Sequence, residues 1–248
     1  QVWIMIDSAE TLKNPRVAIM QPYFLPYIGY FQLICASDVF VFYDDVHFIK
    51  KGWLRRNRIW SNSQELLISL PCKGASQNKL INEVLVDTSH ASFQGIRTSI
   101  EHAYRKSPQW QHVSQLLDDI FHERVCSISE FNERSIKAVM DYLGMPLNAV
   151  KSSELAPETR GMPRAERLIA ISKKLNGTTY INMPGGKALY EPKIFESASV
   201  ALKFLKPRIP NHTAPQAKGR AMNMSIIDAI MHYPPAEINV HLNNFEYD

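Results

Sequence analysis

The sequence predicts an α/β protein with a Rossmann-like, mainly parallel sheet flanked by helices and a helical insertion or lobe in the middle of the chain. Three observations predict it. Short apolar runs at residues 17–20 and 39–43 enclose a stretch of helical spacing at residues 27–36, which is the order of a βαβ unit. Apolar residues then recur at helical spacing through residues 91–143. A second αβ pattern follows in the C-terminal half.

The length of 248 residues fits a single domain. We expect an N-terminal αβ half at residues 1–90, a helical segment at 91–150 and a C-terminal αβ half at 151–248. Residues 1–14 do not resemble a signal peptide, because they carry Asp7 and Glu10 and no long apolar run. No window reaches the roughly 18 apolar residues of a membrane span, so we expect no transmembrane segment and a cytoplasmic protein.

The charge and cysteine content restrict the class of partner. The formal net charge of +4 is small for this length, and it is compatible with an anionic substrate. The basic residues are local rather than spread along a stripe, so we expect no nucleic acid. Cys35, Cys72 and Cys126 are odd in number and widely spaced, which favours reduced thiols over a disulfide framework or a zinc site. Cys72 precedes Lys73, so a nucleophilic role for this thiol stays open.

Polar side chains follow the first two predicted strands. A stretch with two prolines begins at Gln21, and Asp44 and Asp45 come directly after the second apolar run. In open parallel sheets, ligands bind outside the carboxyl ends of the strands. If these two strands are neighbours, Gln21 and the aspartates lie on one rim. This is the strongest physical argument for a site in the sequence.

The rest of the chain supplies further elements. Residues 50–58 are expected to form an exposed loop that leads into residues 59–60. Strands are expected at residues 65–71, 81–86, 178–182 and 200–205, and helices at 163–175 and 224–231. Pro108 separates the first two helices of the helical segment, and Gly144 follows its last helix. A loop is expected to begin at Ser152.

Four residues are candidates for catalysis. Asp44 or Asp45 could serve as a general base or a metal ligand, and only one of them need enter the site because successive strand side chains point to opposite faces. The alternative is that one of them caps a turn or helix. His47 is a second candidate base. Tyr30 could be a general acid or an orienting group, or an aromatic residue packed at helical spacing.

A larger set of residues is expected to bind substrate. Lys50, Arg56 and Asn57 could hold a phosphate or carboxylate, although a solvated basic face is the simpler explanation. Trp53 could stack on a base or sugar. Gly185 and Gly186 could cradle an anion or form an ordinary turn. The complete set of expected binding residues is Gln21, Tyr23, Tyr27, Gly29, Lys50, Trp53, Arg56, Asn57, Gly185 and Gly186.

The N-terminal motifs resemble the WbqC-like protein family. The resemblance rests on residues 20–34 (MQPYFLPYIGYFQLI), 41–46 (VFYDDV) and 48–50 (FIK), and weaker similarity at 81–84 and 225–228 extends it over nearly the whole chain. His47 departs from the pattern, which has Gln or another polar residue there. The segment at residues 211–220 also departs, because it lacks the Tyr- and Gln-bearing pattern expected there.

The resemblance implies a bacterial protein encoded beside surface-polysaccharide (O-antigen) or secondary-metabolite pathways. It implies a transferase that moves an acyl or aminoacyl group onto the amino group of a nucleotide-linked amino sugar or similar amine. The donor would be a thioester of a carrier protein or coenzyme A, with no bound cofactor, and a homodimer stays open. Two alternatives remain: a nucleotidyl or phosphoryl transferase that binds Mg²⁺ through Asp44 or Asp45, and a non-catalytic binding protein of a polysaccharide assembly pathway.

The same motif is also similar to the first strand and helix start of nucleotidylyltransferases, where two histidines grip the phosphates. Here Tyr27 and Tyr30 stand at the two histidine positions. Tyrosine donates a hydrogen bond but carries no positive charge at neutral pH. This similarity therefore favours a Rossmann-like fold without favouring nucleotidyl transfer.

Overall fold

The structure is a computed structural model that describes residues 12–122, 124–208 and 223–248. The expectation for residues 1–14 falls largely outside this part of the chain. The departure from the family pattern at residues 211–220 falls wholly outside it.

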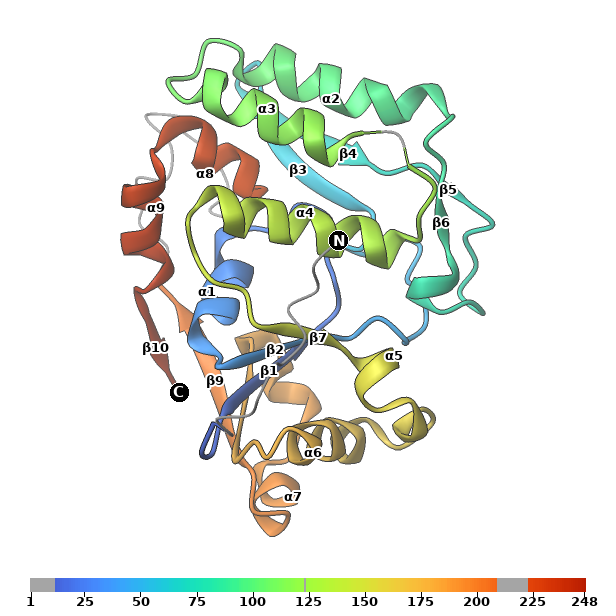
Figure 1. The fold of residues 1–248 in the computed structure, drawn as a ribbon, viewed down its shortest axis with the longest axis vertical. Helices are drawn as coiled ribbons and strands as arrows, with labels where there is room; N and C mark the ends of the chain where they lie inside the picture. Colours follow the sequence, from blue (N-terminus) through green and yellow to red (C-terminus); the bar gives the residue numbers. More distant parts are fainter. Residues whose placement is uncertain (1–11, 123, 209–222) are drawn as a thin grey trace.

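A six-stranded sheet with the order β10-β9-β8-β1-β2-β7 forms the centre of the molecule (Figure 1). Its strands are β1 (Arg16–Met20), β2 (Val39–Phe42), β7 (Ala149–Lys151), β8 (Thr179–Asn182), β9 (Ala201–Pro207) and β10 (Phe245–Tyr247). Only the edge strand β10 is antiparallel to its neighbour. Val17 of β1 pairs with Val39 of β2, so the predicted βαβ unit and its neighbouring parallel strands are confirmed.

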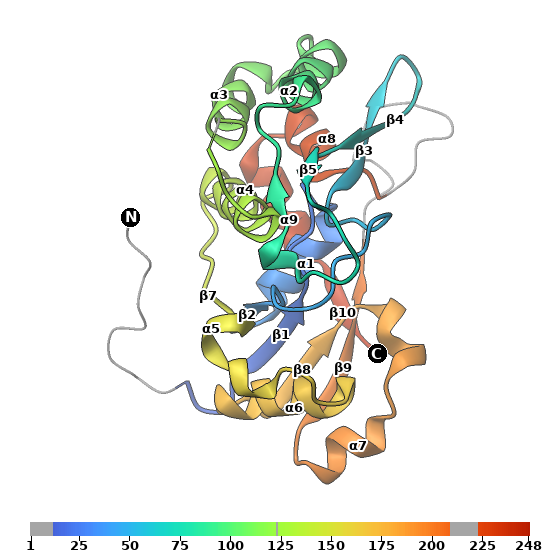
Figure 2. The same cartoon turned by 90° about the vertical axis from the view of Figure 1, so that its right-hand side faces the viewer.

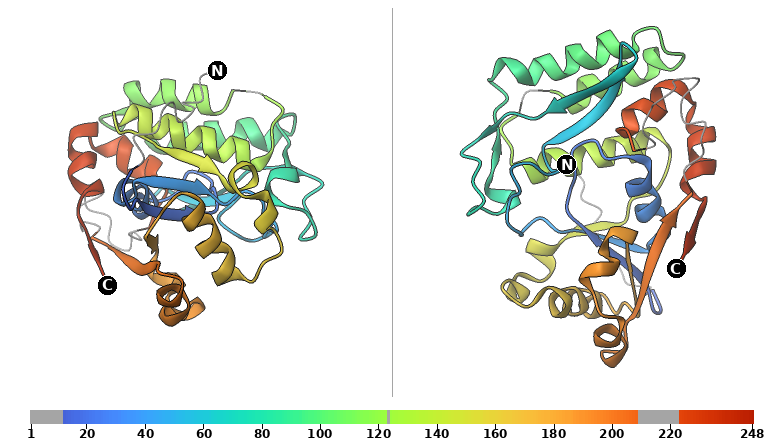
Figure 3. Two further views of the ribbon diagram at one scale, coloured as in Figure 1. Left: turned by 60° about the horizontal axis from the view of Figure 1, so that its bottom comes forward. Right: turned by 180° about the vertical axis from the view of Figure 1, so that it is seen from behind.

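Helices cover both faces of this sheet, as two views of the ribbon show (Figure 3). On one face, α1 (Ile28–Ala36) contacts β1, β8 and β9, and α9 (Pro235–Leu242) packs against α1. On the other face, α6 (Arg164–Lys174) contacts β8, and α7 (Pro192–Ser197) contacts β9. The alternation of strand side chains explains both layers: Ala18 belongs to the core on the α1 side, and Val17 and Ile19 belong to the core with α6 and α7. The chain is therefore an α/β protein with a mixed, mostly parallel sheet.

A second group of elements stands beyond the α1 face (Figure 2). Its helices are α2 (Ala91–Tyr104), α3 (Trp110–Ile120), α4 (Ile128–Tyr142) and α8 (Ile226–His232), and its strands are β3 (Arg56–Ser61), β4 (Gln64–Ser69), β5 (Cys72–Lys73) and β6 (Leu85–Val86). The helices predicted from residues 91–143, 163–175 and 224–231 are confirmed, and Pro108 lies between α2 and α3. The strands predicted at residues 178–182 and 200–205 are confirmed as β8 and β9.

Three local predictions differ from the structure. The loop expected at residues 50–58 is present over residues 50–55, but β3 begins at Arg56 and pairs with β4 as a separate two-stranded hairpin. The strand expected at residues 81–86 is mainly the 3₁₀ helix η1 (Ile81–Glu83), and only β6 is extended. The loop expected from Ser152 begins instead with the short helix α5 (Ser152–Leu155). The first outcome depends on pairing with the neighbouring strand β4. The other two depend on distant parts of the chain, because η1 contacts α4 and Ser152 of α5 donates to Asp45, and local propensity does not register such contacts.

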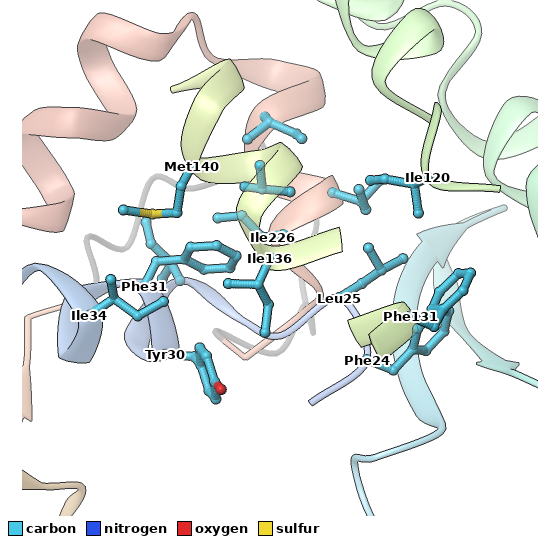
Figure 4. Packing of buried hydrophobic residues seen from close by; sticks show 14 of the residues in the cluster. Phe24, Leu25, Tyr30, Phe31, Ile34, Ile120, Phe131, Ile136, Met140 and Ile226 are labelled. Carbon is cyan, nitrogen blue, oxygen red and sulfur yellow. The ribbon is translucent and has the colours of Figure 1, made fainter. Parts of the chain in front are cut away.

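The proline-rich loop between β1 and α1 is anchored in the core. Its side chains Phe24 and Leu25 are fully buried, and Phe24 packs on Phe131 of α4 with ring centroids 6.2 Å apart (Figure 4). Leu25 has a φ of 43°, which is a left-handed backbone conformation that is strained for a residue with a bulky side chain. Such strain persists only where the surroundings determine the backbone.

Amide and hydroxyl side chains hold the backbone of the proline-rich loop by donating hydrogen bonds to its carbonyl groups. The Asn57 amide donates to the carbonyls of Phe24 and Leu25 at 2.9 and 2.6 Å. The Ser225 hydroxyl donates to the Leu25 carbonyl at 2.8 Å, and the Asn132 amide donates to the Pro22 carbonyl at 2.8 Å. These carbonyls belong to no strand or helix that would supply a backbone donor, so the three polar side chains fix the loop.

We expect Asn57→Ala to lower the free energy of unfolding by about 2–4 kcal/mol, because it leaves the Phe24 carbonyl without a donor and the Leu25 carbonyl with Ser225 alone. Asn78→Ala, at an exposed position, serves as the matched control and should change stability by no more than about 0.5 kcal/mol. Urea denaturation of both variants checks the prediction. Equal stability of the two variants would contradict the anchoring role of Asn57.

Candidate functional site

A cavity of about 330 Å³ lies at the carboxyl ends of β2 and β7, which we call the acidic pocket. Parallel neighbours bring their carboxyl ends to one edge, and Phe42 of β2 is paired with Lys151 of β7. Asp44 and Lys151 therefore meet at this rim. The lining residues are Asp44, Asn82, Leu85, Val125, Cys126, Ser127, Ser129, Glu130, Glu133, Lys151 and Ser153.

The first turns of α4 form the opposite wall of the acidic pocket. Ser127 and Glu130 make a reciprocal capping box, which fixes where the helix begins. One helical turn after Ser129, Glu133 projects from the same face and is 7% exposed. The Ser129 hydroxyl donates to Glu133 Oε1 at 2.5 Å, so the carboxyl group is held in one orientation.

Glu133 has the chemistry of a general acid or base at neutral pH. Burial raises the pKa of its carboxyl group to about 7, against the hydrogen bond from Ser129 and the positive charge of Lys151, which both lower it. The neighbouring Asp44 carboxylate adds to the increase. A group that titrates near the working pH exchanges protons most effectively, so Glu133 is suited to proton transfer.

Lys151 places an ammonium group beside this carboxyl group. Its Nζ atom lies 4.0 Å from Glu133 Oε2 and 3.0 Å from Glu154 Oε1. Burial opposes the charge of Lys151, but the hydrogen bond to Glu154 and the nearby carboxylates raise its pKa overall. The ammonium group therefore stays charged at neutral pH.

The adjacent aspartates lie in different surroundings, and Asp44 is the one that faces the acidic pocket. Its carboxylate accepts from the Ser153 hydroxyl at 2.6 Å, the Ser153 N–H at 3.0 Å and the Asn82 amide at 3.3 Å. The Ser152 hydroxyl oxygen lies 3.1 Å from the same carboxylate, but its proton has the shorter contact with Asp45. These contacts hold the Asp44 carboxylate in one orientation at the rim of the acidic pocket.

Asp45 is held in a buried ion pair away from the lining of the acidic pocket. It is 1% exposed, and Arg167 of α6 donates to both of its oxygens at 2.7 and 2.6 Å. Ser152 donates to it at 2.6 Å, and the half-exposed Arg160 lies 3.4 Å away. These contacts connect the end of β2 to α5 and α6, so Asp45 has a structural role.

The tyrosines predicted for the site cluster at the end of β1. The Tyr30 hydroxyl donates to the Gln21 carbonyl at 2.9 Å, and its ring, 2% exposed, lies 5.7 Å from the ring of Tyr23. Burial raises the pKa of Tyr30 well above its ordinary value and that of Tyr27 to about 12. A side chain at Gly29 would start 2.4 Å from the Tyr27 ring, so packing explains this glycine. The structure brings this group together, but outside the acidic pocket.

The basic residues expected to hold phosphate are not brought together. Lys50 is exposed, the Arg56 guanidinium donates to the Lys51 carbonyl, and Asn57 is buried beneath the proline-rich loop. Trp53 is 45% exposed, with the Arg58 guanidinium 5.2 Å from its ring centroid. His47 is exposed and forms a backbone bridge with Leu80. None of these residues lines the acidic pocket.

Gly185 and Gly186 follow β8 within the 3₁₀ helix η3 (Pro184–Leu189). Since β8 is the other neighbour of β1, these glycines and Gln21 leave adjacent strands at the same edge of the sheet. A Cβ atom at Gly186 would lie 2.4 Å from the Asn182 side chain, whereas one at Gly185 would meet nothing within 4 Å. Close packing thus accounts for Gly186 alone.

The cysteine thiols show no activation. Burial raises the pKa of Cys72 to about 11, although the nearby Arg55 lowers it, and burial also raises the pKa of Cys35 to about 11. Both thiols are therefore protonated at neutral pH, which argues against a nucleophilic Cys72. Within the described residues, no group of three or more His, Cys, Asp or Glu side chains is arranged to hold a metal ion.

Sequence reasoning missed Glu133, Lys151 and Ser129. A signal was present in α4, where the buried face carries four polar residues: Ser129, Asn132, Glu133 and Ser135. Lys151 had no such signal, because β7 has three residues and was not predicted.

Among the described residues, no helix has both the length and the apolar character needed to cross a membrane.

The chain belongs to the WbqC-like protein family, which it matches over residues 21–240. All residues of the acidic pocket lie within the matched region. The chain is similar to the uncharacterized protein Rv1507c of Mycobacterium tuberculosis (strain ATCC 25618 / H37Rv). The two are 28% identical over 194 residues, which cover 76% of this chain and 81% of the relative. No solved structure matches the chain.

Proposed function

We propose that this chain is a transferase that moves an acyl or aminoacyl group onto the amino group of an amino sugar or a similar amine, with the acidic pocket as the acceptor site. The observation that carries the proposal is the buried Glu133 carboxyl group, with a pKa of about 7, beside the Lys151 ammonium group. An activated carboxylate of this kind can take a proton from an amine as the amine attacks.

The lining of the acidic pocket supports an amine-bearing, hydroxyl-rich acceptor. Three carboxyl groups line it, from Asp44, Glu130 and Glu133, against one ammonium group from Lys151. This balance attracts a protonated amine before it reacts. Serine hydroxyls and the Asn82 side chain add the donors and acceptors that sugar hydroxyls require. A volume of about 330 Å³ lies at the lower end for small-molecule sites.

The proposed reaction balances without an external oxidant, reductant or metal ion. The neutral amine nitrogen attacks the carbonyl carbon of a thioester and forms the C–N bond. Glu133 takes the proton from nitrogen, and Lys151 stabilises the charge that develops on the carbonyl oxygen. The C–S bond then breaks, and Glu133 returns the proton to the sulfur, so an amide and a free thiol are the products. The donor would be a thioester of an acyl carrier protein or of coenzyme A.

The strand order supports a nucleotide-linked acceptor. Connections run outward from β1 in both directions, to β2 and β7 on one side and to β8 and β9 on the other, so the order reverses between β1 and β8. This reversal supports a Rossmann-like arrangement, in which nucleotides bind outside the strand ends at the reversal point. Gln21 and Gly185 lie at these ends and are our candidates for holding the nucleotide.

The same strand order also favours the second candidate, a nucleotidyl or phosphoryl transferase that uses Mg²⁺. Calorimetry with nucleoside triphosphates and Mg²⁺ separates the two, since absence of binding would eliminate the second candidate. A place in surface-polysaccharide or secondary-metabolite biosynthesis is part of the proposal. If the chain were instead a non-catalytic binding protein, substitutions in the acidic pocket would leave the pathway product unchanged in cells.

We expect the rate of transfer to rise with pH through about pH 7. The base form of Glu133 is the deprotonated one, and its pKa is raised to about 7, so the active fraction grows as pH increases through that value. Measurement of kcat/KM with a thioester donor and an amino sugar, between about pH 5 and pH 9, checks this. A profile that is flat from about pH 6 to pH 8 would contradict Glu133 as the base.

A further inference from the structure

A second and larger cavity of about 580 Å³ lies between α2 and the β4–β5 segment, and its character differs from that of the acidic pocket. We call it the Arg55 pocket; the residues important here are Arg55, Ile68, His90, Ser92, Gly95 and Ile96. The short β5–β6 ladder separates the two cavities. Cys72 of β5 lines the Arg55 pocket, and Leu85 of β6 lines the acidic pocket.

Arg55 is the feature that points to a ligand. Its Nε atom is buried without a hydrogen-bond partner, and its guanidinium group makes no hydrogen bond or ion pair with any residue that the structure describes. Arg58 and Arg134 also have an unpaired Nε, but their other nitrogens bind Glu65 and Cys126. A buried donor without a partner lowers stability, and an anion from outside the chain would supply the partner that Arg55 lacks.

The first half of α2 makes the opposite wall and leaves room for that anion. Ser92, Gly95, Ile96 and Ser99 recur at helical spacing on one face, and a Cβ atom at Gly95 would meet nothing within 4 Å. His90 caps the helix, and its Nδ1 atom accepts from the Ser92 N–H at 3.2 Å. The other ring nitrogen is then a hydrogen-bond donor.

The one carboxylate of the Arg55 pocket is neutralised locally. Asp87 accepts from the Ser89 hydroxyl at 2.7 Å and lies 3.1 Å from Lys73 Nζ. The hydrogen bond from Ser89, followed by Lys73, lowers the pKa of Asp87. Apolar surface comes from Ile68 and Ile96, with Leu67 beside them 53% exposed.

We propose that the Arg55 pocket binds an anionic group, phosphate or carboxylate, carried on an apolar body. The guanidinium group and the donors at the start of α2 hold the anion. The apolar body lies along Ile68, Ile96 and Leu67. This site is additional to the proposed acceptor site and does not depend on it.

Isothermal titration calorimetry on the full chain tests the proposal with phenyl phosphate, benzoate, phenol and inorganic phosphate as probes. We expect phenyl phosphate or benzoate to bind at least about 10-fold more tightly than phenol and than inorganic phosphate. Arg55→Met should weaken this binding about 10- to 100-fold. Gly95→Leu should block it by filling the cavity. Arg105→Met, at the exposed far end of α2, removes the same charge and should leave binding unchanged.

Thermal unfolding of the free protein distinguishes a ligand-binding role from a structural one. Because Arg55 has no partner within the described chain, Arg55→Met should keep or raise the melting temperature while binding is lost. The proposal is overturned by any of three results: neither anionic probe binds, binding persists in both Arg55→Met and Gly95→Leu, or phenol binds as tightly as the anions. A lowered melting temperature in Arg55→Met, with binding retained, would make Arg55 structural.

Discussion

Replacing Glu133 with glutamine is expected to reduce transfer about 10²- to 10⁴-fold and, at the same time, to make the protein more stable at pH 8. The loss of rate follows because the amide cannot accept the proton of the attacking amine. The gain in stability follows because a buried carboxylate is costly at a pH above its raised pKa of about 7. Glutamine has nearly the same shape and can still accept the hydrogen bond from Ser129.

The pH dependence of that gain has a definite sign. The pKa of Glu133 is raised from 4.5 to about 7 on folding, so the native state binds a proton that the unfolded state has released. The wild-type protein therefore loses stability as pH rises from about 4.5 to about 7, up to about 3 kcal/mol. The variant lacks this loss, so the difference between them should be small at acid pH and constant above about pH 7.

Urea denaturation at several pH values measures this difference, with Glu166→Gln on the exposed face of α6 as the matched control. The control should follow the wild-type protein in both rate and stability. If Glu133→Gln is inactive but also less stable at pH 8, the carboxylate has a structural role, and its assignment as the base is wrong.

Replacing Arg167 with methionine is expected to lower the free energy of unfolding by about 3–5 kcal/mol, the largest loss expected for any of these variants. Arg167 donates to both oxygens of Asp45, and both side chains are almost completely buried. Removal of Arg167 leaves the buried Asp45 carboxylate with the half-exposed Arg160 as its remaining ion pair, which costs more than the intact pair contributes. The affected region is the end of β2, next to Asp44 and the acidic pocket.

Arg160 offers a matched comparison, because it contacts the same carboxylate from an exposed position. Its side chain is 49% exposed, and its Nε atom lies 3.4 Å from Asp45. Arg160→Met should therefore change stability by no more than about 1 kcal/mol. Denaturant midpoints for the two variants measure this contrast. Equal losses of stability would contradict the claim that the buried pair of Arg167 and Asp45 contributes more than the contact with Arg160.

The structure could be predicted from the sequence where residues close together in the chain determine it. The βαβ unit follows from apolar runs on either side of α1, and the position of Asp44 at the end of β2 follows from that unit. The general location of the acidic pocket at a strand-end rim could therefore be predicted. The strand pair that forms it could not, because β7 is short and reaches β2 only after more than a hundred residues of intervening chain.

The roles of individual polar residues were harder to predict, because they depend on tertiary contacts. Asn57 lies in a basic segment and was expected to bind substrate, yet its amide holds the carbonyls of the proline-rich loop. Asp45 was indistinguishable from Asp44 in sequence, and only the position of Arg167 on α6 separates them. Glu133 could be recognised as titrating near neutral pH only after its burial was known.

The central claim, that the acidic pocket holds the amine acceptor with Glu133 as its base, is tested most directly by a crystal structure of the protein soaked with glucosamine. We predict the amino group within hydrogen-bond distance of Glu133 in the acidic pocket, with the sugar hydroxyls on Asp44, Asn82 or the pocket serines. Glucosamine bound elsewhere, or an acidic pocket that stays empty of sugar at saturating glucosamine, would contradict the claim.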